Sequence, residues 1–83
     1  MKITKYAGKS CVKCRIVDQV FKLVTLPCEV ETIYVEDEGN EAFMSKGIES
    51  LPTIVFENEN GKIMLTGTIT PKMINEAIEK LKD

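Results

Sequence analysis

The chain has 83 residues, of which 43% are hydrophobic and 29% are charged, and this favours a single soluble domain over residues 1–83. Its net charge of −2 gives no reason to expect nucleic acid as a partner, and no hydrophobic run approaches the ~20 residues of a membrane span. The lack of histidine excludes Cys/His zinc sites and histidine-dependent catalysis. Three cysteines are too few for a disulfide-stapled secreted scaffold, and no apolar leader follows Met1, so we expect a cytoplasmic location.

Hydrophobic spacing predicts a strand and then a helix at the start of the chain. Residues 2–6 carry β-branched and aromatic side chains and lead to Gly8. Residues 12–24 then carry hydrophobic side chains three and four positions apart, as in an amphipathic helix that ends before Pro27. Ser10 or Cys11 is the expected N-cap of this helix.

The middle of the chain predicts a second strand and a short helix. Residues 30–35 are rich in strand formers, and their hydrophobic run indicates an interior strand buried on both faces. An acidic turn at residues 36–39 is expected to end it. Asn40 is the predicted N-cap of a short helix through residue 46, with Gly47 just beyond its end.

The last third predicts a hairpin followed by a helix. Strands at residues 53–57 and 62–66 flank a loop that contains the Asn-Gly turn pair. Thr70 as N-cap and Pro71 at the first helical position predict a final helix over residues 71–82. Its core-facing positions are expected to be Met73, Ile74, Ala77, Ile78 and Leu81. The predicted order is therefore β-α-β-α-β-β-α.

Cys11 and Cys14 stand three positions apart where the first strand gives way to the helix. Residues so spaced are neighbours on a helix surface, so the two thiols suit either a small disulfide ring or a shared soft metal ion. The first 17 residues contain five basic residues and no acid. This pattern indicates either solvated basic faces or positive charge gathered where a thiolate would lie.

The combined features resemble the thioredoxin superfamily. They are a CxxC pair between strand and helix, Leu51-Pro52-Thr53 before a later strand, an Asn-Gly hairpin, Gly67 and a closing helix. The small size is similar to the glutaredoxin-like redoxins, including those that reduce ribonucleotide reductase. The resemblance implies an α/β thioredoxin-like fold, in which a central four-stranded mixed sheet is flanked by three helices.

The resemblance also implies a thiol-disulfide oxidoreductase, most specifically a dithiol protein-disulfide reductase that carries electrons in cell redox homeostasis. Cys11 would be the nucleophile and Cys14 the resolving cysteine, with a Cys11–Cys14 disulfide in the oxidised form. Pro52 would follow a cis peptide bond beside this disulfide, leaving the backbone of Leu51 to pair with an extended substrate segment.

Further contacts follow from the same resemblance. Lys9 precedes the cysteines and Lys13 stands between them, and both are expected to contact substrate. Gly67 and Thr68 fall in the region where glutaredoxins carry the Gly-Gly pair that holds glutathione, and contacts from these two residues are expected there. Lys5 aligns with the buried acid of thioredoxins, so general-base help from that position is not expected. We expect a monomer without bound cofactor. It would act on disulfide-bearing proteins, with ribonucleotide reductase as one candidate, and take electrons from a thioredoxin reductase-type enzyme or glutathione.

Three alternatives to a reductase remain at this stage. They are a soft-metal module, an oxidant or isomerase, which the reduction potential would distinguish, and a fold retained only for protein binding, against which the intact CxxC argues. Heavy-metal chaperone domains also place a CxxC after their first strand, and such a module would bind Cu(I) through both thiolates. Those domains run β-α-β-β-α-β and end on a strand, so the order of elements discriminates between the two families. Cys28 is interpreted as a semi-buried thiol without a role, the alternative being a regulatory or mixed-disulfide role.

Overall fold

The computed structural model describes residues 1–82, and its four strands form one mixed sheet in the order β2-β1-β3-β4. Strand β1 (Lys2–Ala7) lies at the centre, parallel to β2 (Val30–Tyr34) and antiparallel to β3 (Thr53–Asn58). Strand β4 (Gly61–Thr66) returns antiparallel to β3 through the predicted hairpin. The sheet therefore joins the first segment of the chain to the third quarter of it.

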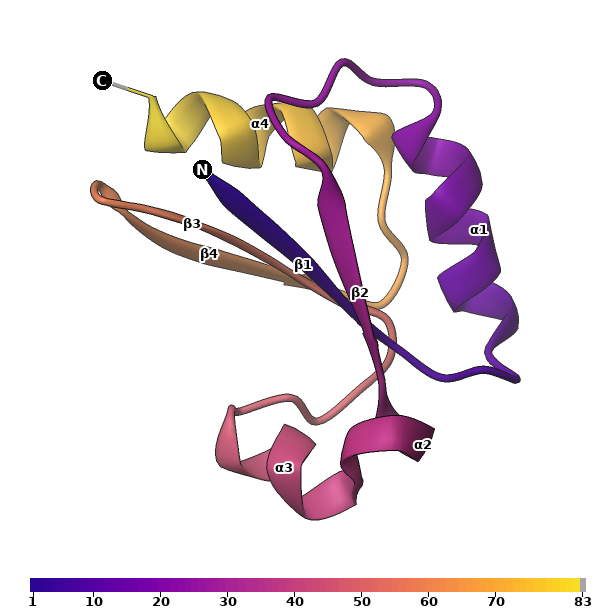
Figure 1. Cartoon of the computed structure of the whole chain (residues 1–83). Coiled ribbons are helices and arrows are strands. Elements are labelled where there is room, and N and C mark those ends of the chain that lie inside the picture. Colours follow the sequence, from indigo (N-terminus) through magenta and orange to yellow (C-terminus); the bar gives the residue numbers. More distant parts are fainter. Residues whose placement is uncertain (83) are drawn as a thin grey trace.

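Helices cover both faces of this sheet, as Figure 1 shows. Helices α1 (Val12–Phe21) and α4 (Pro71–Leu81) lie on one face, and α2 (Val35–Glu38) and α3 (Asn40–Ser45) lie on the other. Successive side chains of a strand point to opposite faces. Tyr6 of β1 meets Phe43 of α3 edge-on, with 5.3 Å between ring centroids, whereas its neighbour Lys5 points to α1.

The main core lies between the sheet and the pair α1 and α4. Its members are mostly aliphatic side chains from all of these elements and from the loop before α4: Ile3, Val17, Val20, Ile54, Phe56, Ile69, Ile74, Ala77, Ile78 and Leu81. The predicted core face of the last helix is thus confirmed, with Met73 packed at its edge. Cys28 also packs against this core and is partly buried, as its interpretation as a semi-buried thiol expects.

Helix α1 ends at Phe21, so its predicted extension to residue 24 is wrong. After Phe21 the backbone tightens, because three successive N–H groups donate to carbonyls only three residues back, as at the end of many helices. These bonds are Lys22 to Gln19, Leu23 to Val20 and Val24 to Phe21. The expected hydrophobic face is also incomplete, since Val12 and Ile16 remain 68% and 54% exposed.

Strand β2 is an edge strand, so the predicted interior strand buried on both faces is wrong. It pairs with β1 alone, and all five of its residues are partly or fully exposed. The chain does not form a simple acidic turn after it. Residues Val35–Glu38 instead form the one-turn helix α2, whose three acids lie in the first turn, where they favour the helix dipole.

The helix ends follow local chemistry. Gly39, not Asn40, is the N-cap of α3. Gly47 lies just beyond α3 at φ +79°, as predicted, and the N–H groups of Gly47 and Ile48 donate to Met44 and Phe43 in a Schellman motif. Thr70 caps α4 as predicted, and its Oγ1 accepts the N–H of Met73 at 3.2 Å.

Candidate active site

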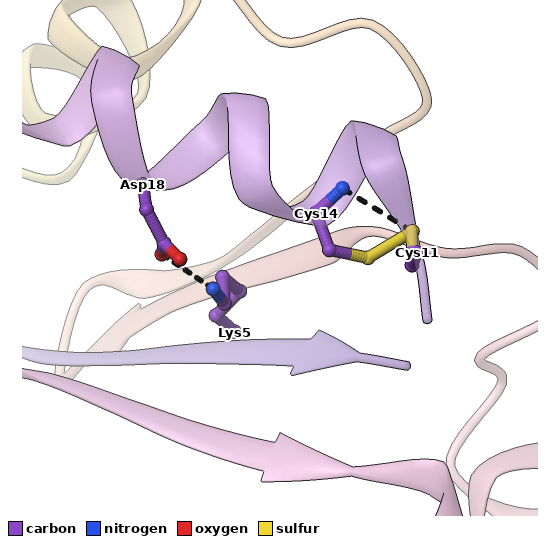
Figure 2. Close-up of polar contacts among 4 residues, drawn as sticks. All are labelled: Lys5, Cys11, Cys14 and Asp18. Carbon is purple, nitrogen blue, oxygen red and sulfur yellow. Dashed lines mark hydrogen bonds and ion pairs between the residues drawn. A yellow bond between two sulfur atoms is a disulfide. The ribbon is translucent and has the colours of Figure 1, made fainter. Parts of the chain in front are cut away.

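Cys11 is the N-cap of α1, and Cys14 lies in the first turn of the same helix. The backbone of Cys11 is extended, so its side chain turns back over the helix end, where Sγ accepts the N–H of Cys14 at 3.2 Å (Figure 2). The structure joins the two sulfurs in a disulfide, with 5.2 Å between the Cα atoms. The helix start thus brings both thiols together with no other element needed to position them.

The two cysteines differ in their access to solvent. Cys14 is 3% exposed and faces the sheet, whereas Cys11 is partly exposed and is followed by the exposed Val12 and Lys13. Unpaired N–H groups and the dipole at a helix start favour a thiolate over a thiol. An incoming disulfide can therefore reach Cys11, and Cys14 lies within reach of it on the inner side.

The loop before β3 lies against the turn before α1. The Leu51–Pro52 peptide bond is cis, which confirms the expectation from the family resemblance, and Pro52 is fully buried. A Cβ placed on Gly8 would lie 3.3 Å from Leu51 Cδ1 and 3.6 Å from the Cβ of Cys11. Gly8 therefore leaves the room that Leu51 occupies beside the motif.

Gly67 and Thr68 lie on the other side of the motif. The carbonyl of Pro52 accepts the N–H of Gly67 at 3.2 Å, which ties the loop after β4 to the loop before β3. Lys13, Gly67 and Thr68 line one small cavity, which Ile16, Val17 and Ile69 complete. The structure thus connects five of the predicted substrate contacts to the motif. Lys13 shares a cavity with Gly67 and Thr68, Gly67 is bonded to Pro52, and Leu51 lies beside Gly8 as Cys11 does.

Lys9, the sixth predicted contact, is engaged with helix α2. Its ammonium lies 2.9 Å from the Asp37 carboxylate and 5.7 Å from the centroid of the Tyr34 ring, and its N–H donates to the carboxylate of Glu36 at 3.1 Å. The hydrogen bond from Lys9 to Asp37 raises the pKa of Lys9 above 10.5. The segment around the cysteines contains no acid in the sequence, but in the fold the carboxylates of Glu36 and Asp37 lie next to it. The prediction of acid-free surroundings is therefore wrong for the folded protein.

The comparisons with known proteins agree with this geometry. The family model described as the thioredoxin domain matches residues 1–79. The chain belongs to the thioredoxin-domain family. No curated protein matches it in sequence.

Solved thioredoxins share the fold of this thioredoxin domain. A mutant thioredoxin from Halobacterium salinarum has a TM-score of 0.78 and 18% identity, over 98% of this chain and 74% of that one. Thioredoxin 1 from Thermosipho africanus has a TM-score of 0.71 and 18% identity, over 96% and 92%. Fasciola hepatica thioredoxin also reaches 0.71, with 24% identity over 96% and 79%. The predicted thioredoxin-like fold is thereby confirmed, and the chain ends its described part on α4, not on the strand that a heavy-metal chaperone domain would have.

Lys5, where the family resemblance would put a buried acid, is itself a buried charge in this thioredoxin domain. Its side chain is 3% exposed and its ammonium forms an ion pair with Asp18 of α1, whose side chain is 54% exposed (Figure 2). Lys5, Asp18 and Cys14 line the same cavity, of about 140 Å³. The sequence reasoning missed Asp18. Its position four residues after Cys14 on the helix was the available indication.

Other possible sites were considered within residues 1–82. No group of three or more Cys, Asp or Glu side chains in this range could hold a metal ion, and no helix in it is long and apolar enough to cross a membrane. Another cavity, of about 660 Å³, is lined by neither Cys11 nor Cys14. It lies between α3 and the loop before β3, and Leu51 is the lining residue that it shares with the surroundings of the motif.

Proposed function

We propose that the protein is a dithiol reductase of protein disulfides and an electron carrier, with Cys11 as the nucleophile. The observation that carries this proposal is the asymmetry of the pair: Cys11 is partly exposed at the helix start and Cys14 is buried behind it. In the reduced protein the Cys11 thiolate attacks one sulfur of a substrate disulfide. The substrate S–S bond breaks, its other sulfur leaves as a thiolate, and a mixed disulfide forms on Cys11.

Cys14 completes the exchange from the inner side of the motif. Its sulfur attacks Cys11 Sγ, the bond between Cys11 and the substrate breaks, and the substrate leaves as a second thiol. Two electrons have then passed from the protein to the substrate, and the protein holds the Cys11–Cys14 disulfide that the structure contains. The short path between the two sulfurs supports this order of events.

The surfaces next to Cys11 supply the substrate contacts of this proposal. An extended substrate segment would pass Leu51 and Pro52 on one side of the motif. Lys13, Gly67 and Thr68 would contact it on the other side, around the cavity that they line. Lys9 would act mainly through α2, because Asp37 already engages its ammonium.

We further propose that the protein works in the cytoplasm as a monomer, without a resident cofactor. Its oxidised form would be reloaded by a thioredoxin reductase-type enzyme or by glutathione. Proteins with an accessible disulfide are the expected substrates, and ribonucleotide reductase is one candidate because of the resemblance to the redoxins that serve it.

The decisive experiment uses Cys14→Ser, with Cys28→Ser as the matched control. Cys14→Ser is expected to accumulate a mixed disulfide through Cys11 when mixed with a disulfide-bearing protein such as insulin, and to lose turnover. Cys28→Ser is expected to turn over as the parent does. Peptide mass spectrometry locates the mixed disulfide. Turnover by Cys14→Ser at the parent rate would show that the two-thiol mechanism is wrong.

A second experiment identifies the electron donor. The oxidised protein is supplied with either NADPH and thioredoxin reductase or reduced glutathione, and the appearance of free thiols is followed. Fast reduction by one of the two donors would identify it as the source of electrons for this protein. If neither donor reduces the protein but the reduced form binds Cu(I) tightly and leaves insulin intact, a soft-metal module replaces the proposed reductase.

A further inference from the structure

Lys5 is a charged side chain in a row of buried ones. On β1, Ile3, Lys5 and Ala7 point to the face that α1 and α4 cover, and all three are almost fully buried. Its ammonium crosses the gap to α1, where Asp18 accepts it (Figure 2). Every buried side-chain nitrogen and oxygen among the described residues has a partner, so the lysine is accommodated without strain on its hydrogen bonding.

Stability alone does not account for a lysine at this position. Bringing a charge out of water is unfavourable, and replacement of a buried ion pair by hydrophobic side chains is often neutral or stabilising. The partner Asp18 is half exposed and would stay hydrated if Lys5 were replaced by an apolar residue. A methionine at position 5 would continue the row of buried apolar side chains on β1. We therefore look for the role of the Lys5 ammonium in the groups that lie next to it.

Cys14 is the reactive group beside Lys5. Both side chains line the same small cavity, and Asp18 lies four residues after Cys14, a spacing that brings Cβ atoms to about 5–6 Å on a helix. Figure 2 shows Lys5 rising from β1 toward the helix side that carries both Asp18 and the Cys14 sulfur. A cation acts more strongly on a thiolate in such a buried setting than through water.

The other charged or titratable groups around Cys14 are less suited than Lys5 to stabilise a Cys14 thiolate. The cavity is also lined by Arg15, by Tyr34 and by Lys9, whose ammonium forms an ion pair with Asp37. Glu36 of α2 lies near Gly8, and the β3 residue that pairs with Lys5 is the uncharged Ile54. Lys5 is the fully buried cation of this set, so solvent screens it least.

We propose that Lys5 is a positioning residue for the second half of the exchange: its ammonium stabilises the Cys14 thiolate, and Asp18 holds that ammonium beside the sulfur. The proposal rests on the function proposed above for its role in turnover. In the mixed disulfide, in which Cys11 Sγ is bonded to the substrate sulfur, the proton of Cys14 passes to water through the cavity that Cys14 lines. The thiolate then attacks Cys11 Sγ, and the departing substrate sulfur takes up a proton from water.

The same charge assists reloading of the protein. A donor thiolate that attacks Cys11 Sγ breaks the Cys11–Cys14 bond, and Cys14 leaves with the electron pair. A sulfur that is better stabilised as a thiolate leaves faster. Lys5 therefore lowers the barrier for Cys14 in both directions: when Cys14 attacks Cys11 Sγ and releases the substrate, and when Cys14 leaves Cys11 Sγ as the donor attacks it.

The test is a titration of Cys14 in Cys11→Ser protein labelled with carbon-13 at the cysteine Cβ atoms. The Cβ shift follows thiolate formation over roughly pH 5 to 11 and needs no access of a reagent to the buried sulfur. Lys5→Met is expected to raise the midpoint for Cys14 by about one pH unit or more. Lys13→Met, which removes an exposed lysine adjacent to Cys14, is expected to raise it by clearly less.

Cys28 provides an internal reference, since its midpoint should be the same in all variants. Lys5→Gln repeats the test if Lys5→Met does not fold, as judged by circular dichroism. An unchanged or lower Cys14 midpoint in the folded Lys5 variant, or a shift no larger than that of Lys13→Met, overturns the proposal. The titration uses no substrate, so it can fail while the mixed-disulfide trap succeeds, and the reverse also holds.

Discussion

Helices α1 and α4 start in the same way and serve different purposes. Each has an extended N-cap residue whose side chain accepts the N–H three residues on, at 3.2 Å in both cases. The cap of α4 is Thr70, whose hydroxyl oxygen accepts the N–H of Met73. The cap of α1 is Cys11, whose sulfur also forms the disulfide. One backbone arrangement therefore serves as a stabilising cap in one helix and as a thiolate site in the other.

The two helices also differ in how much of their hydrophobic side chains they bury. Helix α4 buries Ile74, Ala77, Ile78 and Leu81 in one continuous stripe. Helix α1 buries Cys14, Val17 and Val20 but leaves Val12 and Ile16 open to solvent near the disulfide. The comparison teaches that α4 is built for the core, whereas α1 gives up part of its burial to a surface that a substrate can contact.

The largest expected difference between the two helices is the loss of stability when one isoleucine of each is replaced by alanine. Ile74→Ala removes a fully buried side chain of α4 and is expected to lower the free energy of unfolding by about 2–5 kcal/mol. Ile16→Ala, on the exposed face of α1, is expected to change it by less than about 0.5 kcal/mol and to raise KM for a protein disulfide. Urea unfolding and insulin reduction measure the two effects. Equal losses of stability would contradict the comparison.

The ion pairs of the two helices provide the next contrast. Asp18→Asn leaves the buried ammonium of Lys5 without its charged partner and is expected to lower the free energy of unfolding by about 1–3 kcal/mol. Glu76→Gln on α4 breaks an exposed pair with Lys72, 3.8 Å apart, and is expected to lower it by about 0.2–0.5 kcal/mol. Thermal unfolding of both variants at one pH measures which variant loses more stability. A larger loss in Glu76→Gln than in Asp18→Asn would contradict this prediction.

The two caps differ in what their removal affects. Thr70→Ala is expected to lower the free energy of unfolding by about 1 kcal/mol and to leave insulin reduction intact. Cys11→Ser retains a good N-cap, so the stability of the reduced protein should stay close to that of the parent while reduction of insulin disappears. Both proteins are unfolded in urea with excess reductant, which removes the contribution of the disulfide. Residual turnover by Cys11→Ser would contradict the assignment of the nucleophile.

The smallest expected effect is the pH dependence of the Lys9–Asp37 pair before α1. The pKa of Lys9 is raised above 10.5 in the folded protein by the hydrogen bond to Asp37, so the pair stabilises the protein below pH 10.5. That stabilisation is lost as the pH rises through the folded pKa of Lys9. The parent should therefore exceed Asp37→Asn in stability at neutral pH and approach it in strongly alkaline urea titrations. A gap that widens with pH would refute this sign.

Local chemistry explains why much of the fold was predictable. Thr70 with Pro71, Gly47 after a short helix and the Asn-Gly pair each act on their own backbone, so their effects can be read along the sequence. The cysteine pair is local too, because both thiols belong to one helical turn. These residues identified the elements and the centre of the site.

The features that the sequence did not reveal depend on contacts between distant segments. The edge position of β2 follows from which strands pair with β1, and its hydrophobic run does not encode that choice. Asp18 reaches Lys5 across 13 positions, and Asp37 reaches Lys9 across 28. Such pairs can be identified only once the arrangement of the sheet and helices is known. For this reason the sequence did not reveal the acids that lie next to the basic segment around the cysteines.

The central position of β1 has a consequence for how the chain is made. Strand β1 is synthesised first, but its partner β3 follows about 50 residues later, since Tyr6 pairs with Thr53 and Lys2 with Glu57. At about 5–20 residues per second this interval lasts roughly 3–10 s on the ribosome. All three cysteines are synthesised within it, before the sheet can bury Cys14. Cys11 and Cys14 are three positions apart, whereas Cys28 follows Cys14 by 14 positions, so closeness along the nascent chain favours the same pair that the folded helix joins.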